Sequence, residues 1–307
     1  MSWIKVFAPA TIANIGPGFD ILGMAIKGAG DIIKARKTDS GVIITQIEST
    51  GDIPSDPNKN TAGIAAQEVL KIIGESGGLE LRIKKGLPIG SGLGSSAVSA
   101  AAGAFAANYL YGKKLSKEKL IIPATLAESK VSAFHADNTA STLLGGVVLV
   151  RSVSPLDVVR LGIIDDLTLI VVTPNIIVLT KIAREVLPQK VDFSAFVQNL
   201  GNASAVTASF ITNDYNLFAR SLSDIIVEPV RAPLIQGFQQ VKEAALSSGA
   251  DGVGISGSGP TLFAITNRSG NTAAQIEKAM VSGFKEAGIA ASSFITTVDE
   301  EGVRILE

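Results

Sequence analysis

The sequence predicts an α+β protein built from two lobes, and three observations lead to this prediction. β-rich runs alternate with helical runs along the 307 residues. The β-rich runs alternate apolar and polar residues more often than they are uniformly apolar, which is typical of mixed or antiparallel sheets with helices on one face. The chain is also longer than the size at which a single core usually stops growing, so two domains or two fused lobes are expected.

Each predicted strand or helix follows from its local pattern. Strands are predicted where β-branched and aliphatic residues gather between turn-forming residues, over residues 3–15, 41–48, 79–86, 145–152 and 167–174. Helices are predicted where the sequence carries helix start and stop signals, over residues 60–76, 95–111, 117–132, 180–187, 193–212, 232–248 and 271–287. Residues 154–167 lie between two strand-like runs, so we expect lobes at residues 1–160 and 161–307.

Composition excludes several kinds of partner and metal site. Hydrophobic residues make up 46% and charged residues 18%, which is typical of a globular chain. The formal net charge is −1 without a long block of one sign, so electrostatics give no reason to expect nucleic acid or an anionic membrane as a partner. The absence of cysteine excludes disulfides, thiolate zinc sites and iron–sulfur clusters. Because His135 is the single histidine, metal chemistry would use oxygen ligands and a hard ion such as magnesium.

The hydrophobic runs predict neither a leader nor a membrane span. The start, MSWIKVFAPATIANIG, lacks the basic stretch and apolar core of a signal peptide. Runs such as GGVVLV and LTLIVV are too short to cross a bilayer. We therefore expect a cytoplasmic protein.

A glycine-rich loop precedes an alanine-rich helix at residues 88–103, PIGSGLGSSAVSAAAG. Gly90, Gly92 and Gly94 allow positive φ and a close approach of the main chain to a ligand. Ser95 or Ser96 is expected to cap the helix that follows. Unpaired N–H groups and the positive end of the helix dipole would then form an anion site that needs no lysine. The alternative is a tight turn into a helix whose alanines simply allow close packing.

Two common phosphate-binding patterns do not fit this chain. The P-loop requires lysine and then serine or threonine after its last glycine, whereas Gly112–Lys113 is followed by another lysine. The Rossmann pattern occurs literally as GVGISG at residues 252–257, but Pro260 and a β-rich run follow where a helix should begin. We therefore expect no dinucleotide site there, and a strand–turn–strand link is the simplest interpretation.

Four ordered motifs resemble those of the GHMP kinases, in the version found in homoserine kinases. The loop at 88–98 resembles the phosphate-binding motif of that superfamily. APATIANIGPGFDILG at 8–23 resembles its N-terminal motif, FHADNTASTLLGG at 134–146 the homoserine kinase version of a later segment, and GVGISGSGPTLFAI at 252–265 its C-terminal glycine motif. The resemblance implies an N-terminal lobe like ribosomal protein S5 domain 2 and a ferredoxin-like C-terminal lobe, with the glycine motif at 252–261 beside the phosphate loop.

The resemblance also implies ATP and Mg²⁺ as the ligands of this region. ATP would contact Pro88, Ile89, Gly90, Ser91, Gly92, Leu93, Gly94, Ser95, Ser96, Ala97, Ser258 and Gly259. The metal would be held by Ser96, with Ser95 as the rival, and by Glu128. Taken alone, Glu128 is as well explained by a solvated helix face, because glutamate is usually exposed.

Homoserine carries an ammonium, a carboxylate and a hydroxyl, and the resemblance implies a residue for each. Asp20 would bind the ammonium and Asn14 the hydroxyl end, although an Asx-capped turn explains both equally well locally. Arg184 and Arg231 would bind the carboxylate, since guanidinium forks fit carboxylates, unless they form surface ion pairs. Thr180 would add a hydroxyl contact. His135 would contact the substrate near the reacting oxygen, unless it is structural.

The corresponding region offers no clear general base. In HADN, Asn138 is expected to orient the substrate hydroxyl while the γ-phosphate takes the proton, and Asp137 is the rival base. Other GHMP kinases, such as mevalonate-pathway or sugar kinases, and a non-catalytic ligand sensor are the alternatives. Mevalonate, the substrate of a mevalonate kinase, has no ammonium for Asp20 to bind. A nucleic-acid module is disfavoured by the near-neutral charge and by the 5% aromatic content. Homodimers are common in the superfamily, but nothing in the sequence itself shows one.

Overall fold

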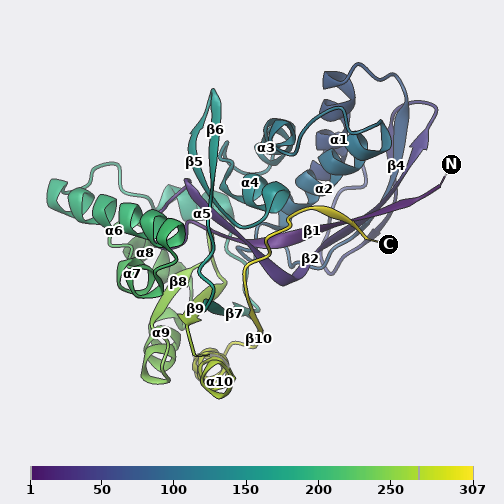
Figure 1. Cartoon of the computed structure of the whole chain (residues 1–307). Coiled ribbons are helices and arrows are strands. Elements are labelled where there is room, and N and C mark those ends of the chain that lie inside the picture. Colours follow the sequence, from purple (N-terminus) through teal and green to yellow (C-terminus); the bar gives the residue numbers. More distant parts are fainter. Residues whose placement is uncertain (1, 269, 307) are drawn as a thin grey trace.

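Two β-sheets organise the computed structural model, which describes residues 2–268 and 270–306 (Figure 1). The first sheet contains β1 (Ile4–Ala13), β2 (Leu22–Thr38), β3 (Val42–Glu48), β4 (Gly78–Lys84), β5 (Val147–Val153), β6 (Leu156–Leu161) and β11 (Arg304–Leu306). The second contains β7 (Thr168–Pro174), β8 (Gly252–Ile255), β9 (Leu262–Thr266) and β10 (Ala291–Thr296). β3 and β4 run parallel and the other described pairs are antiparallel, so the prediction of mixed sheets in an α+β fold is confirmed.

The long strand β2 connects the parts of the first sheet. It pairs with β1 along one edge, while its other edge pairs with β5 near its start and with β4 near its end. β11 returns from the far end of the sequence to pair with β1, so the two ends of the described chain lie side by side (Figure 1). The turn between β1 and β2 carries the N-terminal motif, and this turn faces the second sheet through Gly257, whose N–H donates to the carbonyl of Ala13.

Helices cover one face of the first sheet. They are α1 (Thr61–Ile72), α2 (Ser95–Leu110), the 3₁₀ turn η1 (Glu118–Leu120), α3 (Ile121–Glu128) and α4 (Asp137–Leu144). The alanines of α2 are buried against α1, β1 and β2. At Gly103 a Cβ would lie 2.2 Å from the carbonyl oxygen of Ala62, so the two helices approach closely because their contact residues are small. Close packing of the alanine helix is therefore confirmed.

The second sheet separates two hydrophobic cores. Leu169 and Val171 of β7 face the core shared with the first sheet, whereas Ile170 and Val172 face a smaller core. The helices that follow β7 in the chain are α5 (Thr180–Glu185), α6 (Phe193–Thr212), α7 (Tyr215–Ser221), α8 (Glu228–Arg231), the 3₁₀ turn η2 (Ala232–Leu234), α9 (Phe238–Ser247) and α10 (Asn271–Glu286). α6 and α7 pack into the shared core, whereas α9 and α10 pack into the smaller one. Burial on both faces explains why β7 is uniformly apolar rather than alternating.

The five predicted strands are confirmed, each with ends within two residues of the prediction. Three helix predictions were partly wrong. The helix predicted at 60–76 ends at Ile72. The helix predicted at 232–248 begins only at Phe238, because Ile235 is extended and Gly237 adopts φ +85°. The helix predicted at 117–132 ends at Glu128. No described helix has the length and apolar character needed to span a membrane.

Two of the elements that were not predicted, β2 and α4, were missed for identifiable physical reasons. In β2 the alternation of apolar and polar residues breaks at Gly28–Gly30, in the middle of the strand. In α4 all eight residues are buried, and its serine and threonine side chains bond within the core. Five of its eight residues are Asp, Asn, Ser or Thr, which have low helix propensity, so the local sequence gives only a weak indication of a helix.

Candidate active site

The glycine loop forms one wall of a cavity that is also lined by residues of the N-terminal motif and of α5. Gly90, Gly92 and Gly94 have φ values of +66°, +85° and +72°, and a Cβ at Gly94 would lie 2.2 Å from the hydroxyl oxygen of Thr11. α2 begins at Ser95, and its N-cap is the left-handed Gly94, without a capping side chain. The prediction of a serine cap was therefore wrong. Because no described side chain caps this end, the first N–H groups of α2 are available to an anion.

The C-terminal glycine motif lies beside this loop, as expected. Residues 252–266 form a β8–turn–β9 hairpin. The Ser256 hydroxyl donates to the carbonyl of Gly92 at 2.7 Å, and the N–H of Thr261 donates to the carbonyl of Ser91 at 3.0 Å. A Cβ at Gly92 would lie 2.4 Å from the carbonyl oxygen of Ser256, so the two segments can approach this closely only because Gly92 lacks a side chain.

Most of the predicted site residues line this single cavity of about 460 Å³. They are Asn14, Asp20, Ile89, Gly90, Ser91, Gly92, Gly94, Ser95, Ser96, Glu128, His135, Asn138, Thr180, Arg184, Arg231 and Ser258, and the rival base Asp137 lines it too. Pro88, Leu93, Ala97 and Gly259 lie outside the lining. Leu93 and Ala97 are instead buried, with exposures of 2% and 0%.

Ser96 and Glu128 meet at the start of α2. The Ser96 hydroxyl donates to Oε1 of Glu128 at 3.4 Å, whereas the Ser95 hydroxyl donates to the carbonyl of Leu87. Oε2 of Glu128 is buried and has no hydrogen-bond partner among the described residues. Burial, reinforced by the charge of Asp137, raises the pKa of Glu128 to about 7. An orphaned buried carboxylate oxygen next to a hydroxyl is a donor set that fits a hard cation.

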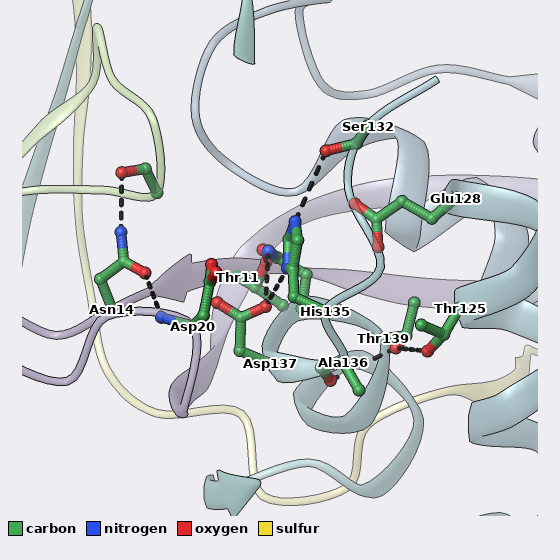
Figure 2. A network of polar contacts seen from close by, with 12 residues as sticks. Thr11, Asn14, Asp20, Thr125, Glu128, Ser132, His135, Ala136, Asp137 and Thr139 are labelled. Atoms are coloured by element: carbon green, nitrogen blue, oxygen red, sulfur yellow. Dashed lines mark hydrogen bonds and ion pairs between the residues drawn. The ribbon is translucent and has the colours of Figure 1, made fainter. Parts of the chain in front are cut away.

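His135, Asp137 and Asn138 form a connected polar network (Figure 2). Nδ1 of His135 lies 2.5 Å from Oδ1 of Asp137, and Nε2 lies 3.5 Å from the Ser132 hydroxyl. Burial alone would lower the pKa of His135, but the carboxylates around it, led by Asp137, raise it to about 9. The Thr11 hydroxyl donates to Oδ1 of Asn138 at 2.6 Å. The network therefore carries a protonated imidazole at neutral pH.

Asn14 and Asp20 lie at opposite ends of the turn between β1 and β2, and both adopt positive φ. The backbone N–H of Asp20 donates to Oδ1 of Asn14 at 3.1 Å, and Nδ2 of Asn14 donates to the carbonyl of Gly257 at 2.9 Å. The Asn14 side chain therefore bridges the ends of the turn across six residues, rather than the two of an Asx turn, and the Asp20 carboxylate lines the cavity (Figure 2). Left-handed backbone at non-glycine residues is strained, and such strain is concentrated at functional sites.

The two arginines come from different elements and converge on this turn. Arg184 of α5 forms a bidentate ion pair with Asp20, at 3.0 and 2.7 Å. Arg231 of α8 is 3% exposed and donates to the carbonyls of Ala183 and Gly257. Burial, together with the charge of Arg184, lowers the pKa of Arg231 to about 10. Thr180 lies on α5, with its hydroxyl 3.5 Å from that of Ser258.

Three lysines of the cavity lining, Lys59, Lys85 and Lys181, were not predicted as site residues. Lys85 is buried and ion-paired with Asp31, and its ammonium also donates to the carbonyl of Ser95 at 2.7 Å and to the Ser99 hydroxyl at 2.8 Å. It thus anchors the first turn of α2 to β2. We had expected an anion site formed without lysine, but lysines line the same cavity as the glycine loop. The position of Lys85 shortly before the glycine loop could have indicated that its side chain lies near the start of α2.

Comparison with known proteins gives a consistent assignment. The GHMP kinases N terminal domain matches residues 60–146, and the GHMP kinases C terminal domain matches residues 206–286. A homoserine kinase of Chlorobium phaeobacteroides is 40% identical, with 100% of each chain covered. One from Methanocella arvoryzae is also 40% identical, over 100% of this chain and 98% of the relative.

Solved structures agree with this assignment. The crystal structure of homoserine kinase from Cytophaga hutchinsonii is 43% identical, with a TM-score of 0.95 over 100% of this chain and 98% of that one. L. major mevalonate kinase shares the fold at 18% identity and a TM-score of 0.69. The chain belongs to the GHMP kinases and, within them, to the homoserine kinase family.

Proposed function

We propose that this chain is an ATP-dependent kinase that phosphorylates the hydroxyl of L-homoserine to O-phospho-L-homoserine, on the route to threonine. One observation carries the proposal: a single cavity joins the uncapped start of α2 to a cluster of one acid and two arginines. The helix start suits a triphosphate, and the cluster suits a molecule that bears both an ammonium and a carboxylate. The names of the relatives agree with this substrate.

The substrate is proposed to lie between these two ends of the cavity. Its ammonium would pair with Asp20, its carboxylate with Arg184 and Arg231, and Thr180 and His135 would add polar contacts. Asn14 and Asn138 would bind at the hydroxyl end. In this arrangement Asp20 and Arg184, which pair with each other in the structure, would each exchange a protein partner for a substrate partner of the same charge. Arg231, which donates to two backbone carbonyls, would gain a charged partner.

Mg²⁺ is proposed to bind at Ser96 and Glu128, whose orphaned buried Oε2 supports this assignment. When bound with ATP, the ion neutralises phosphate charge that develops during transfer. Before the ion binds, burial keeps Glu128 poised between its neutral and ionised forms. Ser96, rather than Ser95, is proposed as the hydroxyl ligand because its hydroxyl faces Glu128.

Transfer is proposed to proceed without a dedicated protein base. The substrate oxygen attacks the γ-phosphorus, the bond to the β–γ bridging oxygen breaks, and the hydroxyl proton passes to an oxygen of the transferred phosphoryl group. Asn138 orients the hydroxyl, with its own side chain fixed by Thr11. The engagement of Asp137 with a charged His135 supports a positioning function for this carboxylate rather than proton abstraction.

The test is a coupled assay of ADP release with Mg²⁺, ATP and a panel of alcohols. L-Homoserine is expected to be the best acceptor, and product analysis should show O-phospho-L-homoserine. Phosphorylation of mevalonate or a sugar, but not of homoserine, would assign the chain to a different GHMP activity. Binding of ATP without turnover of any acceptor would favour a non-catalytic sensor.

We propose lobes at residues 1–160 and 161–307, with β11 returning to the first sheet. A homodimer is proposed because homodimers are common in the superfamily, and sedimentation equilibrium would test it. A cytoplasmic location and the absence of a nucleic-acid or membrane partner follow from composition, and fractionation of cells would test the location.

A further inference from the structure

Phe19 belongs to the turn that carries Asn14 and Asp20, yet none of the proposed contacts with ATP or homoserine uses it. Its ring is half-buried and lies outside the cavity lining. Two guanidinium groups lie near this one ring. Cζ of Arg231 is 4.9 Å from the ring centroid, and Cζ of Arg184 is 5.5 Å from it. Both distances are within the range in which the negative face of an aromatic ring attracts a cation.

The two arginines need such a group because their charges repel each other. Arg231 is almost fully buried. Among the described residues, its hydrogen-bond acceptors are the neutral carbonyl groups of Ala183 and Gly257. The repulsion from Arg184 contributes to the lowered pKa of Arg231. Arg184 has Asp20 as its counter-ion, but its Nε is buried without a hydrogen-bond partner among the described residues. A carboxylate in the cavity would satisfy both cations, and before it arrives they must be kept close together.

We propose that Phe19 is a positioning residue that holds Arg184 and Arg231 side by side as a carboxylate subsite, and that it thereby sets the preference of the site for an amino acid over an amino alcohol. This inference rests on the proposed function, since it concerns the same substrate. Asp20, the next residue in the chain, pairs with Arg184 at the same time. The turn between β1 and β2 thus orients Arg184 through the charge of Asp20, and it orients both arginines through the ring of Phe19.

The experiment compares two acceptors, L-homoserine and 3-aminopropan-1-ol, which lacks only the carboxylate. Phe19→Leu and Phe19→Met remove the aromatic face and keep much of the apolar volume, whereas Phe19→Tyr keeps the ring. Phe7→Leu is the matched control, because Phe7 lies 4.7 Å from Cζ of Arg304 in a similar contact away from the cavity. kcat and KM are measured for both acceptors and for ATP, with thermal melting as the test of folding.

For Phe19→Leu and Phe19→Met we expect the KM for homoserine to rise roughly tenfold. The KM for ATP and the kcat/KM for the amino alcohol should stay within about twofold, so the ratio of kcat/KM between the acceptors falls roughly tenfold. Phe19→Tyr should retain the preference, and Phe7→Leu should leave it unchanged.

Two outcomes overturn the proposal, and they differ from a failure of the proposed function. If the wild type phosphorylates homoserine and a folded Phe19→Leu or Phe19→Met protein keeps the wild-type ratio, Phe19 does not position the subsite. If these variants lose activity on both acceptors in proportion, Phe19 is merely structural. A wild type that phosphorylates neither acceptor would instead refute the kinase assignment, and the inference would fall with it.

Discussion

Arg184 and Asp20 form a two-point ion pair across 164 residues of sequence, with guanidinium nitrogens 3.0 and 2.7 Å from the two carboxylate oxygens. Both side chains are about one-quarter to one-third exposed, and they face the same cavity. In the proposed reaction these groups bind opposite ends of one zwitterion. The pair therefore neutralises the charges of Asp20 and Arg184 against each other.

Replacing Asp20 by Asn should remove both the counter-ion of Arg184 and the partner of the substrate ammonium. We expect the KM for homoserine to rise by about 100-fold, because a charge-assisted pair contributes roughly 1.5–3 kcal/mol. The KM for ATP should change by less than about threefold, since Asp20 is proposed to contact homoserine alone. Asp157→Asn, which removes the exposed Arg151–Asp157 pair, is the control and should change neither constant. Equal losses for both substrates would contradict a specific role in binding the amino acid.

Gly94→Ala tests the close approach at the start of α2. The new Cβ would lie 2.2 Å from the Thr11 hydroxyl and 2.7 Å from Oδ1 of Asn138, on a backbone with φ +72°. We expect the KM for ATP to rise at least tenfold, or kcat to fall by a similar factor. A loss of about 1.4 kcal/mol of binding or transition-state free energy, caused by misplacing the loop, is sufficient for this change. Gly112→Ala is the control, because Gly112 also has positive φ, +93°, but its Cβ would meet nothing within 4 Å. It should lose roughly 1 kcal/mol of stability with normal kinetics.

Glu128→Gln should lower kcat and at the same time stabilise the metal-free protein at alkaline pH. The pKa of Glu128 in the folded state, about 7, lies above its ordinary value of 4.5. Stability associated with the neutral acid is therefore fully present below pH 4.5 and is lost as the pH rises toward 7. Urea unfolding at pH 8 in EDTA should show the variant more stable by up to about 3 kcal/mol.

Added magnesium should reverse this difference, since the ion would compensate the buried carboxylate. Glu286→Gln, at an exposed position on α10, is the matched control and should show neither effect. Equal stability of wild type and Glu128→Gln at both pH 4 and pH 8 would mean that the carboxylate is not desolvated as described.

His135 should make stability depend on pH over an alkaline range. Its pKa is about 9 in the folded state against an ordinary value of 6.5, so the stabilisation is fully present below pH 6.5 and is lost as the pH rises through 9. We expect His135→Gln to destabilise by roughly 3 kcal/mol at pH 6 and by much less at pH 10. Chemical denaturation at both values measures this, and a penalty independent of pH would show that packing, rather than charge, explains the loss.

Asp137→Asn separates the two candidate mechanisms. If Asp137 only positions His135, kcat should fall by less than about 100-fold, because a general base contributes roughly 10²–10⁴. The variant should also shift the pH dependence of stability in the same direction as His135→Gln, since the two residues form one pair. Loss of turnover with intact affinities for ATP and homoserine would make Asp137 the base and refute unassisted transfer.

Local sequence was sufficient for features that depend on neighbouring residues. The three glycines of the phosphate loop predicted left-handed backbone because other residues are strained there, and Gly90, Gly92 and Gly94 all have positive φ. The start of α2, five strands and the family motifs were predicted for the same reason, because turn chemistry and periodicity are carried by residues close together in the chain. The choice of Ser95 or Ser96 as the cap failed, since the glycine itself takes that position.

Tertiary structure alone decided how distant side chains pair. Lys85 with Asp31, Arg184 with Asp20, and Phe19 with two arginines join segments whose spacing carries no periodic signal. Packing also decided α4, because its Asp, Asn, Ser and Thr residues have low helix propensity and all eight of its residues are buried. The sequence by itself therefore predicted which ligand groups this protein would bind. Packing determined which charges neutralise one another around them, because electrostatic energies depend on distance and burial rather than on order along the chain.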